Sequence, residues 1–439
     1  MKTRIPHIYV HTLGCSKNVV DSEVLVAQAR ANDFVVTESV DQADVLVINT
    51  CGFIEAAKQE SIEHILQGVE LRKKGNLKKL LVMGCLSQRY QSDLESEIPE
   101  VDRYFGTMHL PEILEELGGG YKYELLGERT LSTPQHFAYL KISEGCDNPC
   151  SFCSIPLMRG GHRSKPMDEL LIEARLLKAR GVRELILIGQ DLTYYGLDLY
   201  EKRSLAELLQ RLSDLGFDWI RLLYAYPAKF PVDILPVIRE RENIVKYLDM
   251  PIQHVDTEVL KSMRRGVTEK RLRELIGQIR DEVPGIRMRT TLIVGYPTET
   301  REQYETLLQF MKDIRFDRLG VFAYSQEDGT TAYNLGDPIS RKEKQRRVAE
   351  AMKVQEAISF EKNQALIGQV MPVLIDRIEE GVAYGRTEFD TPEVDNEVII
   401  QGASEGFKVS DLKVGEFYQV EMIDAEAFDL FGEIRHYEG

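Results

Sequence analysis

Short apolar runs alternate with longer amphipathic segments over the first ~135 residues. The short runs have the length of β-strands and the longer segments have the helical period, a pattern typical of a parallel α/β sheet. We expect strands at Ile8–Leu13, Val45–Asn49 and Leu80–Met83, and helices near Asp21–Ala31, Ala56–Lys73 and Gln88–Ile98. The first domain is therefore assigned to residues 1–135, and it ends in a linker, Gly118–Pro134, that is interrupted by glycine and proline.

The same alternation continues through residues 136–362, which we assign to a second domain. Strands are expected at Phe137–Ser143, Glu184–Gly189, Trp219–Leu223, Tyr247–Met250, Met288–Val294 and Arg318–Phe322. Helices are expected between them, at Met167–Arg180, Ser204–Leu215, Arg271–Asp281 and Glu302–Lys312. Six strand–helix units predict an open, partial (β/α) barrel whose site is built from the loops that follow the strands.

The period changes to two near the C-terminus, as in Gln369–Ile375 and Phe417–Ile423. Turns are expected at five glycines of this region, Gly381, Gly402, Gly406, Gly415 and Gly432. Residues 365–439 are therefore predicted to form a third domain, a small antiparallel β-barrel. The fold class as a whole is α/β, with this barrel appended.

The bulk composition excludes several classes of protein. Hydrophobic residues make up 43% of the 439 residues and charged residues 29%, as in ordinary globular proteins. No apolar run approaches the ~18 residues of a membrane-spanning helix, and residues 1–13 do not resemble a signal peptide. Six cysteines in so long a chain are no disulfide framework, so we expect a reducing compartment, the cytoplasm, and no membrane partner.

Negative charge is concentrated in the last domain. The chain carries a net charge of −16, of which −12 lies in residues 365–439, with 17 acidic and 5 basic side chains. Such a domain would repel a polyanion such as RNA and attract a basic protein. A solvated acidic face that serves only solubility is the alternative interpretation.

Three cysteines, Cys146, Cys150 and Cys153, stand in the pattern C-x3-C-x2-C directly after the first strand of the central domain. Soft thiolates select iron–sulfur clusters, zinc or Cu(I). A 4Fe–4S cluster held by three thiolates keeps one iron without a protein ligand, and a small molecule can bind there. The alternative is a zinc site completed by a histidine such as His162.

The other three cysteines, Cys15, Cys51 and Cys85, each follow one predicted strand of the first domain. The carboxyl ends of parallel strands share one edge of a sheet, so these thiols are expected to meet there. Gly14 and Gly84 precede two of them and would allow close approach to a bulky ligand. The pattern predicts a second cluster site, although buried cysteines are often merely small hydrophobic residues.

The two cysteine triplets and the terminal barrel resemble, over essentially the whole chain, the methylthiotransferases, a family of radical S-adenosylmethionine (SAM) enzymes. Phe152 fits this resemblance, because the family places an aromatic residue before the last cysteine of the motif. The resemblance implies two 4Fe–4S clusters, a radical SAM barrel and a terminal TRAM barrel. It also implies that Phe152, Gln190 and Asp191 contact SAM.

Four segments are similar to the branch of the family that modifies small-subunit ribosomal protein S-twelve (RimO type): Ile155–Gly160, Gly189–Gly196, Leu222–Pro227 and Tyr247–His254. The branch that modifies adenosine in tRNA (MiaB type) more often shows Gln-Asn-Val-Asn where this chain has Gln190-Asp191. One departure is Lys165, where arginine is commoner in the family. The charge of the last domain favours the same branch.

The resemblance implies a reaction that ordinary acid–base side chains cannot perform, insertion of sulfur at an unactivated carbon. The cluster at Cys146, Cys150 and Cys153 would cleave SAM, and the resulting radical would take hydrogen from the β-carbon of an aspartate. The cluster at Cys15, Cys51 and Cys85 would supply the methylated sulfur. The partners would be ribosomal protein S-twelve and a low-potential electron donor of the flavodoxin or ferredoxin type, with no tRNA substrate. Alternatives are a tRNA methylthiotransferase and, from another class, a non-catalytic iron–sulfur sensor or carrier.

Overall fold

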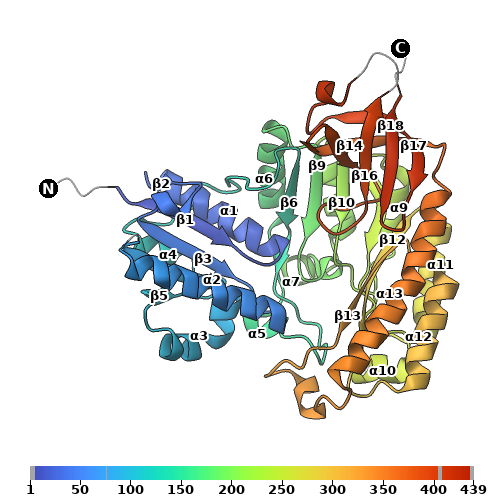
Figure 1. Ribbon diagram of the computed structural model, residues 1–439, viewed down its shortest axis with the longest axis horizontal. Coiled ribbons are helices and arrows are strands. Elements are labelled where there is room, and N and C mark those ends of the chain that lie inside the picture. Colours follow the sequence, from blue (N-terminus) through green and yellow to red (C-terminus); the bar gives the residue numbers. More distant parts are fainter. Residues whose placement is uncertain (1–4, 76, 404–407, 436–439) are drawn as a thin grey trace.

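Three packed units make up the part of the chain that the computed structural model describes, residues 5–75, 77–403 and 408–435 (Figure 1). The N-terminal unit lies beside the central unit, and the C-terminal unit caps the top of the central unit in this view. No helix in the described ranges is both long enough and apolar enough to cross a membrane.

The N-terminal unit is a parallel sheet of five strands in the order β2-β1-β3-β4-β5. The strands are β1 (His7–Thr12), β2 (Val35–Val36), β3 (Val45–Thr50), β4 (Lys79–Gly84) and β5 (Arg103–Tyr104). The helices are α1 (Ser16–Ala31), α2 (Glu55–Lys73), α3 (Cys85–Glu97) and α4 (Leu110–Glu116), with a 3-10 turn η1 at Val40–Gln42. Strand β3 is buried along its whole length, because helices cover both faces of the sheet.

Two helices of this unit begin earlier than the sequence pattern predicts. Helix α1 starts directly after Cys15, and Cys85 is itself the first residue of α3. The connections are this short because Gly14 (φ 90°) and Gly84 (φ 103°) adopt a backbone conformation that L side chains rarely reach. The cysteines therefore lie at helix starts as well as at strand ends.

The central unit is an open parallel sheet of six strands in the order β13-β12-β11-β10-β9-β6, which confirms the predicted partial barrel. Its strands are β6 (Phe137–Lys141), β9 (Glu184–Ile188), β10 (Trp219–Leu222), β11 (Ile244–Asp249), β12 (Arg287–Val294) and β13 (Arg318–Ala323). Its helices are α5 (Ile155–Arg159), α6 (Met167–Ala179), α7 (Leu197–Tyr200), α8 (Leu205–Ser213), α9 (Ile234–Glu240), α10 (Thr257–Ser262), α11 (Glu269–Glu282), α12 (Arg301–Ile314) and α13 (Arg341–Gln364). A small two-stranded sheet joins β7 (Ser143–Glu144) to β8 (Arg163–Ser164), and 3-10 turns lie at η2 (Leu192–Tyr194) and η3 (Thr331–Leu335).

The C-terminal unit is a closed five-stranded barrel in the order β14-β15-β16-β18-β17, as predicted for a small barrel. Its elements are β14 (Val370–Glu379), β15 (Val382–Arg386), β16 (Glu397–Ala403), β17 (Phe417–Ala425), β18 (Asp429–Ile434) and a 3-10 turn η4 (Val409–Asp411). The pairing of β16 with β18 is parallel, whereas the other four contacts are antiparallel. Of the glycines expected at turns, Gly381 and Gly415 do lie in turns, but Gly402 and Gly432 lie inside β16 and β18. Gly406 lies outside the described residues.

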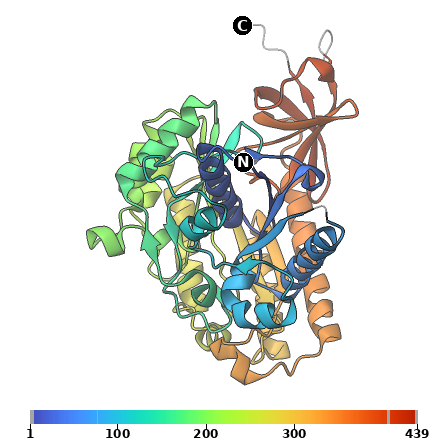
Figure 2. The same cartoon turned by 90° about the vertical axis from the view of Figure 1, so that its left-hand side faces the viewer.

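The barrel packs against the amino ends of the central strands. Helix α13 runs along the central unit and leads into β14 (Figures 1 and 2). Arg318, the first residue of β13, donates to Asp390, and Glu184, the first residue of β9, pairs with Arg386. The carboxyl ends of the same strands are thereby left to face the N-terminal unit.

Candidate active site between two sheets

One cavity of about 470 Å³ is lined by all six cysteines of the chain. Cys15, Cys51 and Cys85 follow β1, β3 and β4 of the N-terminal sheet, and the other three follow β6 and β7 of the central sheet. Further wall residues come from the loops after β9, β10 and β11. The carboxyl ends of two parallel sheets therefore meet across a single space, where ligands of α/β folds bind.

The loop from Cys146 to Cys153 is held by backbone hydrogen bonds from both of its sides. Cys146 N donates to Gly160 O (3.1 Å), and Ser151 N donates to Met263 O (3.0 Å). Gly145 has a φ of 74°, and a Cβ there would lie 2.0 Å from Gly161 O. The three thiols of the predicted SAM-cleaving cluster are thus presented by a tightly packed turn.

A buried arginine accompanies this triplet. Arg265 Nη1 lies 3.2 Å from Cys150 Sγ, and the guanidinium stacks over the Tyr226 ring at 4.1 Å. The Tyr226 hydroxyl lies 3.6 Å from the same sulfur. A cation at this distance compensates the negative charge of a thiolate.

The second triplet is assembled by close packing of neighbouring strand ends. A Cβ on Gly14 would lie 2.7 Å from Cys51 Cβ, and a Cβ on Gly84 would lie 2.5 Å from Asn49 Oδ1. The two glycines therefore make room chiefly for the adjacent strand ends, rather than for a ligand as the sequence suggested. Asn18, which is buried, donates to Leu13 O and Thr50 O and so ties the ends of β1 and β3 together.

Arg159, on α5 of the central unit, links the two triplets. It lines the cavity and donates to Asn18 Oδ1, Asp21 Oδ2 (2.9 Å) and the Glu144 carboxylate (3.1 Å). Lys141 pairs with the same two carboxylates. Burial raises the pKa of Glu144, but the Lys141 and Arg159 charges outweigh that effect and lower it to about 2. This buried network joins the N-terminal and central units on one side of the cavity.

Burial makes most of the cavity thiols weak acids. It raises the pKa of Cys146 to about 11 and those of Cys85 and Cys153 to about 12, and it also raises the pKa of Cys51. Metal binding requires the thiolate, so loading of these sites releases protons. None of the six is in a disulfide, and the soft donors fit iron–sulfur clusters.

The geometry gives no support to a mononuclear zinc site. Among the described residues, no three His, Cys, Asp or Glu side chains are placed to hold a single metal ion. His162, the suggested fourth zinc ligand, is not part of the cavity wall, and its Nε2 lies 3.1 Å from Ser164 Oγ. A cluster of four irons is wider than one ion, so thiols that are further apart suit it better.

The predicted SAM contacts differ in their positions. Phe152 and Gln190 line the cavity, and Gln190 donates to Glu144 Oε1 (2.8 Å) while its own Oε1 is without a partner in the described structure. Asp191 is fully buried behind the wall, where it accepts from Thr193 N and from Asn148 Nδ2 (2.8 Å). Asp191 therefore positions Asn148, which does line the cavity, and a direct contact of Asp191 with SAM stays a prediction.

Sequence reasoning missed three cations of the cavity wall, Lys17, Arg159 and Arg265. Lys17 is two residues after Cys15, and Arg159 lies in a segment quoted for the family resemblance, so their neighbourhood was a usable signal. Arg265 is 112 residues from Cys153 in sequence, and nothing local marks it.

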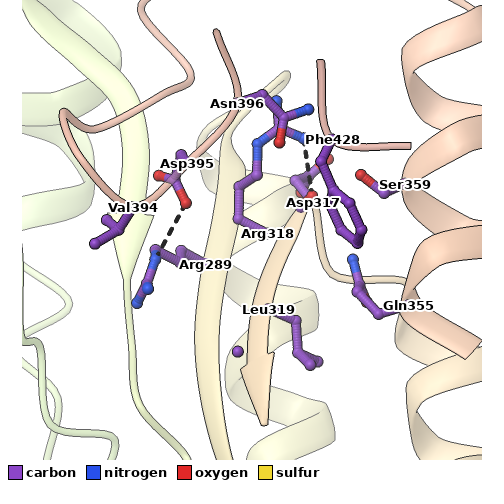
Figure 3. A pocket seen from close by; sticks show the side chains of 11 residues that line it. Arg289, Asp317, Arg318, Leu319, Gln355, Ser359, Val394, Asp395, Asn396 and Phe428 are labelled. Carbon is purple, nitrogen blue, oxygen red and sulfur yellow. Dashed lines mark hydrogen bonds and ion pairs between the residues drawn. The ribbon is translucent and has the colours of Figure 1, made fainter. Parts of the chain in front are cut away.

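A second, smaller cavity of about 80 Å³ lies between the central unit and the barrel (Figure 3). The charged side chains that line this cavity form ion pairs with one another or with close neighbours. Arg289 contacts Asp395 (3.2 Å) and Asp249 (3.1 Å), Arg318 contacts Asp390 (2.6 Å), and Asp317 contacts Lys362 (2.6 Å). These ion pairs make the cavity part of the packing between the central unit and the barrel.

Three family models match successive parts of the chain. Uncharacterized protein family UPF0004 matches residues 7–106, the radical SAM superfamily matches residues 140–311, and the TRAM domain matches residues 367–434. Each match corresponds to one of the three packed units, and the central unit continues past its match through β13 and α13. A radical SAM domain implies a 4Fe–4S cluster and SAM.

Similar proteins cover the chain from end to end. The ribosomal protein uS12 methylthiotransferase RimO of Chloroherpeton thalassium is 61% identical over 99% of this chain and 100% of its own length. Those of Flavobacterium johnsoniae and Christiangramia forsetii are 54% and 53% identical, over 97% of this chain and 97% and 94% of their own lengths. Among solved structures, the radical SAM methyltransferase TsrM of Kitasatospora setae superimposes with a TM-score of 0.57 at 12% identity, covering 89% of this chain and 80% of that one. That likeness concerns the fold alone.

Proposed function

The chain belongs to the family of ribosomal protein uS12 methylthiotransferases, and on that premise we propose that it attaches a methylthio group to the β-carbon of an aspartate of uS12. It is a radical SAM enzyme by its central domain. The observation that carries the proposal is the single cavity on which both cysteine triplets open. A reaction that joins a substrate radical to a sulfur needs both centres within reach of one carbon.

Each triplet would hold its own cluster. In the proposal Cys146, Cys150 and Cys153 hold the SAM-cleaving 4Fe–4S cluster, and Cys15, Cys51 and Cys85 hold a second one. When bound, the clusters supply radical generation from SAM and the methylated sulfur, chemistry that no side chain provides. Arg265 and Arg159 balance thiolate charge, and the apolar side chains of Phe53, Ile54, Phe152 and Met158 exclude water from the space.

The choice of a protein substrate over tRNA has a second support in charge. Part of the acidity of the C-terminal domain is neutralised inside the molecule, since Asp390 and Asp395 pair with arginines of the central sheet. Glu380, Asp424 and Glu426 remain exposed and acidic. They suit a basic ribosomal protein and repel RNA.

The free thiols suit a reducing cytoplasm. A flavodoxin- or ferredoxin-type protein would donate the electrons.

The deciding experiment is anaerobic reconstitution, followed by reaction with uS12 and with tRNA in separate tubes. We expect about eight irons per chain, as two 4Fe–4S clusters require. Mass spectrometry should find a methylthio gain on one aspartate of uS12 and none on tRNA. A methylthio gain on tRNA alone would establish the MiaB-type alternative. About four irons and no product from either substrate would instead favour a sensor or carrier.

A further inference from the structure

Lys17 differs from the other cations of the cavity wall in its surroundings. Lys17 is the second residue of α1, it is only 7% exposed, and it lines the cavity. Its Nζ lies 3.1 Å from the centre of the Tyr224 ring, which belongs to the central unit. Among the described residues, no Asp or Glu forms an ion pair with it. The buried ammonium group of Lys17 thus contacts an aromatic face.

The other two cations of the wall already have anionic partners. Arg159 pairs with Asp21 and Glu144, and Arg265 contacts the sulfur of Cys150. No Asp or Glu lines the cavity within the described chain. Lys17 is therefore the cavity cation whose charge is left for a ligand.

Helix stability does not account for a lysine at this position. A cation in the first turn opposes the helix dipole, and α1 has no acidic residue in its first turn to offset it. A buried charge without an ion partner carries a further desolvation cost, which a cation–π contact of about 0.5–2 kcal/mol offsets only in part. An anionic ligand would remove the remaining cost.

Tyr224, whose ring contacts the Lys17 ammonium group, is held in a strained backbone conformation. Tyr224 has a φ of 66°, which is unusual for a bulky residue. Its backbone N donates to Asp249 Oδ2 (3.0 Å), and its carbonyl O accepts from Leu192 N (3.1 Å). Strain of this kind persists where the surrounding structure enforces it, commonly at ligand sites.

We propose that Lys17 binds the side-chain carboxylate of the target aspartate, with the Tyr224 ring fixing the ammonium group from below. The inference rests on the proposed function, because it takes the modified residue to be an aspartate. In an aspartate the reacting β-carbon is bonded directly to the carboxyl carbon. A cation that holds the carboxylate therefore also determines where the β-carbon lies between the two triplets. An adenosine offers no carboxylate, so this contact selects protein over tRNA.

The test measures binding of two forms of uS12 to the reconstituted enzyme. One form carries the target aspartate, and the other carries asparagine there, which has the same shape without the charge. We expect the unaltered enzyme to bind the aspartate form about 10- to 100-fold more tightly, as a hydrogen bond to a charged group allows. Lys17→Met should abolish this preference and raise KM for uS12, whereas Lys17→Arg should retain most of it.

Matched measurements separate this role from a structural one. Lys74→Met, at an exposed lysine directly after the end of α2, should change nothing. Iron content and deoxyadenosine release should be normal in Lys17→Met; if that variant loses iron, Lys17→Gln replaces it. The proposal is overturned if the unaltered enzyme binds both forms equally, if Lys17→Met keeps the preference, or if it weakens SAM binding instead. If the unaltered enzyme leaves uS12 unmodified, the proposed function itself has failed, whatever residue stands at position 17.

Discussion

The central unit meets its two neighbours through buried ion pairs in both cases, yet the two contacts differ in what they enclose. The contact with the N-terminal unit surrounds a cavity of about 470 Å³ and keeps Lys17 without an ion partner among the described residues. The contact with the barrel surrounds about 80 Å³, and its arginines meet carboxylates. Buried ion pairs alone are therefore no sign of function.

The difference follows from strand polarity. The N-terminal unit faces the carboxyl ends of the central strands, where loops are free to present thiols and polar groups. The barrel faces the amino ends, where Glu184 and Arg318 begin their strands. A change at the first contact should alter chemistry, and a change at the second should alter stability alone.

The largest effect should come from replacing one cysteine triplet at a time inside the larger cavity. Replacement of Cys146, Cys150 and Cys153 by alanine should reduce deoxyadenosine release to background, because SAM cleavage depends on that site. Replacement of Cys15, Cys51 and Cys85 should leave deoxyadenosine release while eliminating methylthio transfer. Chromatography of the nucleoside and mass analysis of uS12 provide the two measurements. Loss of both activities in the second variant, with the first cluster still present, would contradict this division.

An intermediate effect should separate the two contacts directly. Arg159→Met and Arg318→Met each remove a buried guanidinium from carboxylates, which costs on the order of 3–5 kcal/mol of unfolding free energy. Urea unfolding should show a comparable loss in both. Methylthio transfer, measured where both variants are folded, should fall only in Arg159→Met. Equal impairment of transfer in the two folded proteins would remove the distinction between the contacts.

The smallest effect concerns the acid stability of the barrel contact. Burial raises the pKa of Asp376, but Arg386 and His136 outweigh that effect and hold it below 3.8. Its ionised form therefore stabilises the folded chain above the unfolded pKa, and this contribution is lost as pH falls through the lower folded pKa. Asp376→Asn should flatten the fall of unfolding free energy between about pH 5 and pH 3. The exposed Glu379→Gln serves as the control, and an equal flattening there would contradict the assignment.

Features that depend on one strand and the residue after it were predictable from the sequence. The cysteines after Leu13, Asn49 and Met83 were expected on one sheet edge, and they are found there together. The central sheet and the barrel were likewise evident from periodicity. The parallel pairing of β16 with β18 was not, because period two is common to both strand directions.

Contacts between units could not be read from local pattern. That Arg265 touches Cys150, or that Arg159 reaches Asn18, depends on how separate units dock. The position of Asp191 in a family motif suggested a contact with SAM, and that contact stays a prediction. The structure adds a role that the motif did not indicate, because Asp191 caps a 3-10 turn. Sequence pattern located the thiols, but not the charges that surround them.

The placement of the barrel sets a minimum length for anything that touches both ends of the molecule. The barrel contacts Arg287, the first residue of β12, and the cavity is lined by Thr291, four residues further along the same strand. Four residues of a strand span about 13 Å at the usual rise. A free aspartate is too short to reach from the cavity to the barrel, whereas a folded protein can engage both at once. A substrate that contacts both the barrel and the cavity must span this distance, which favours a whole protein over a free amino acid.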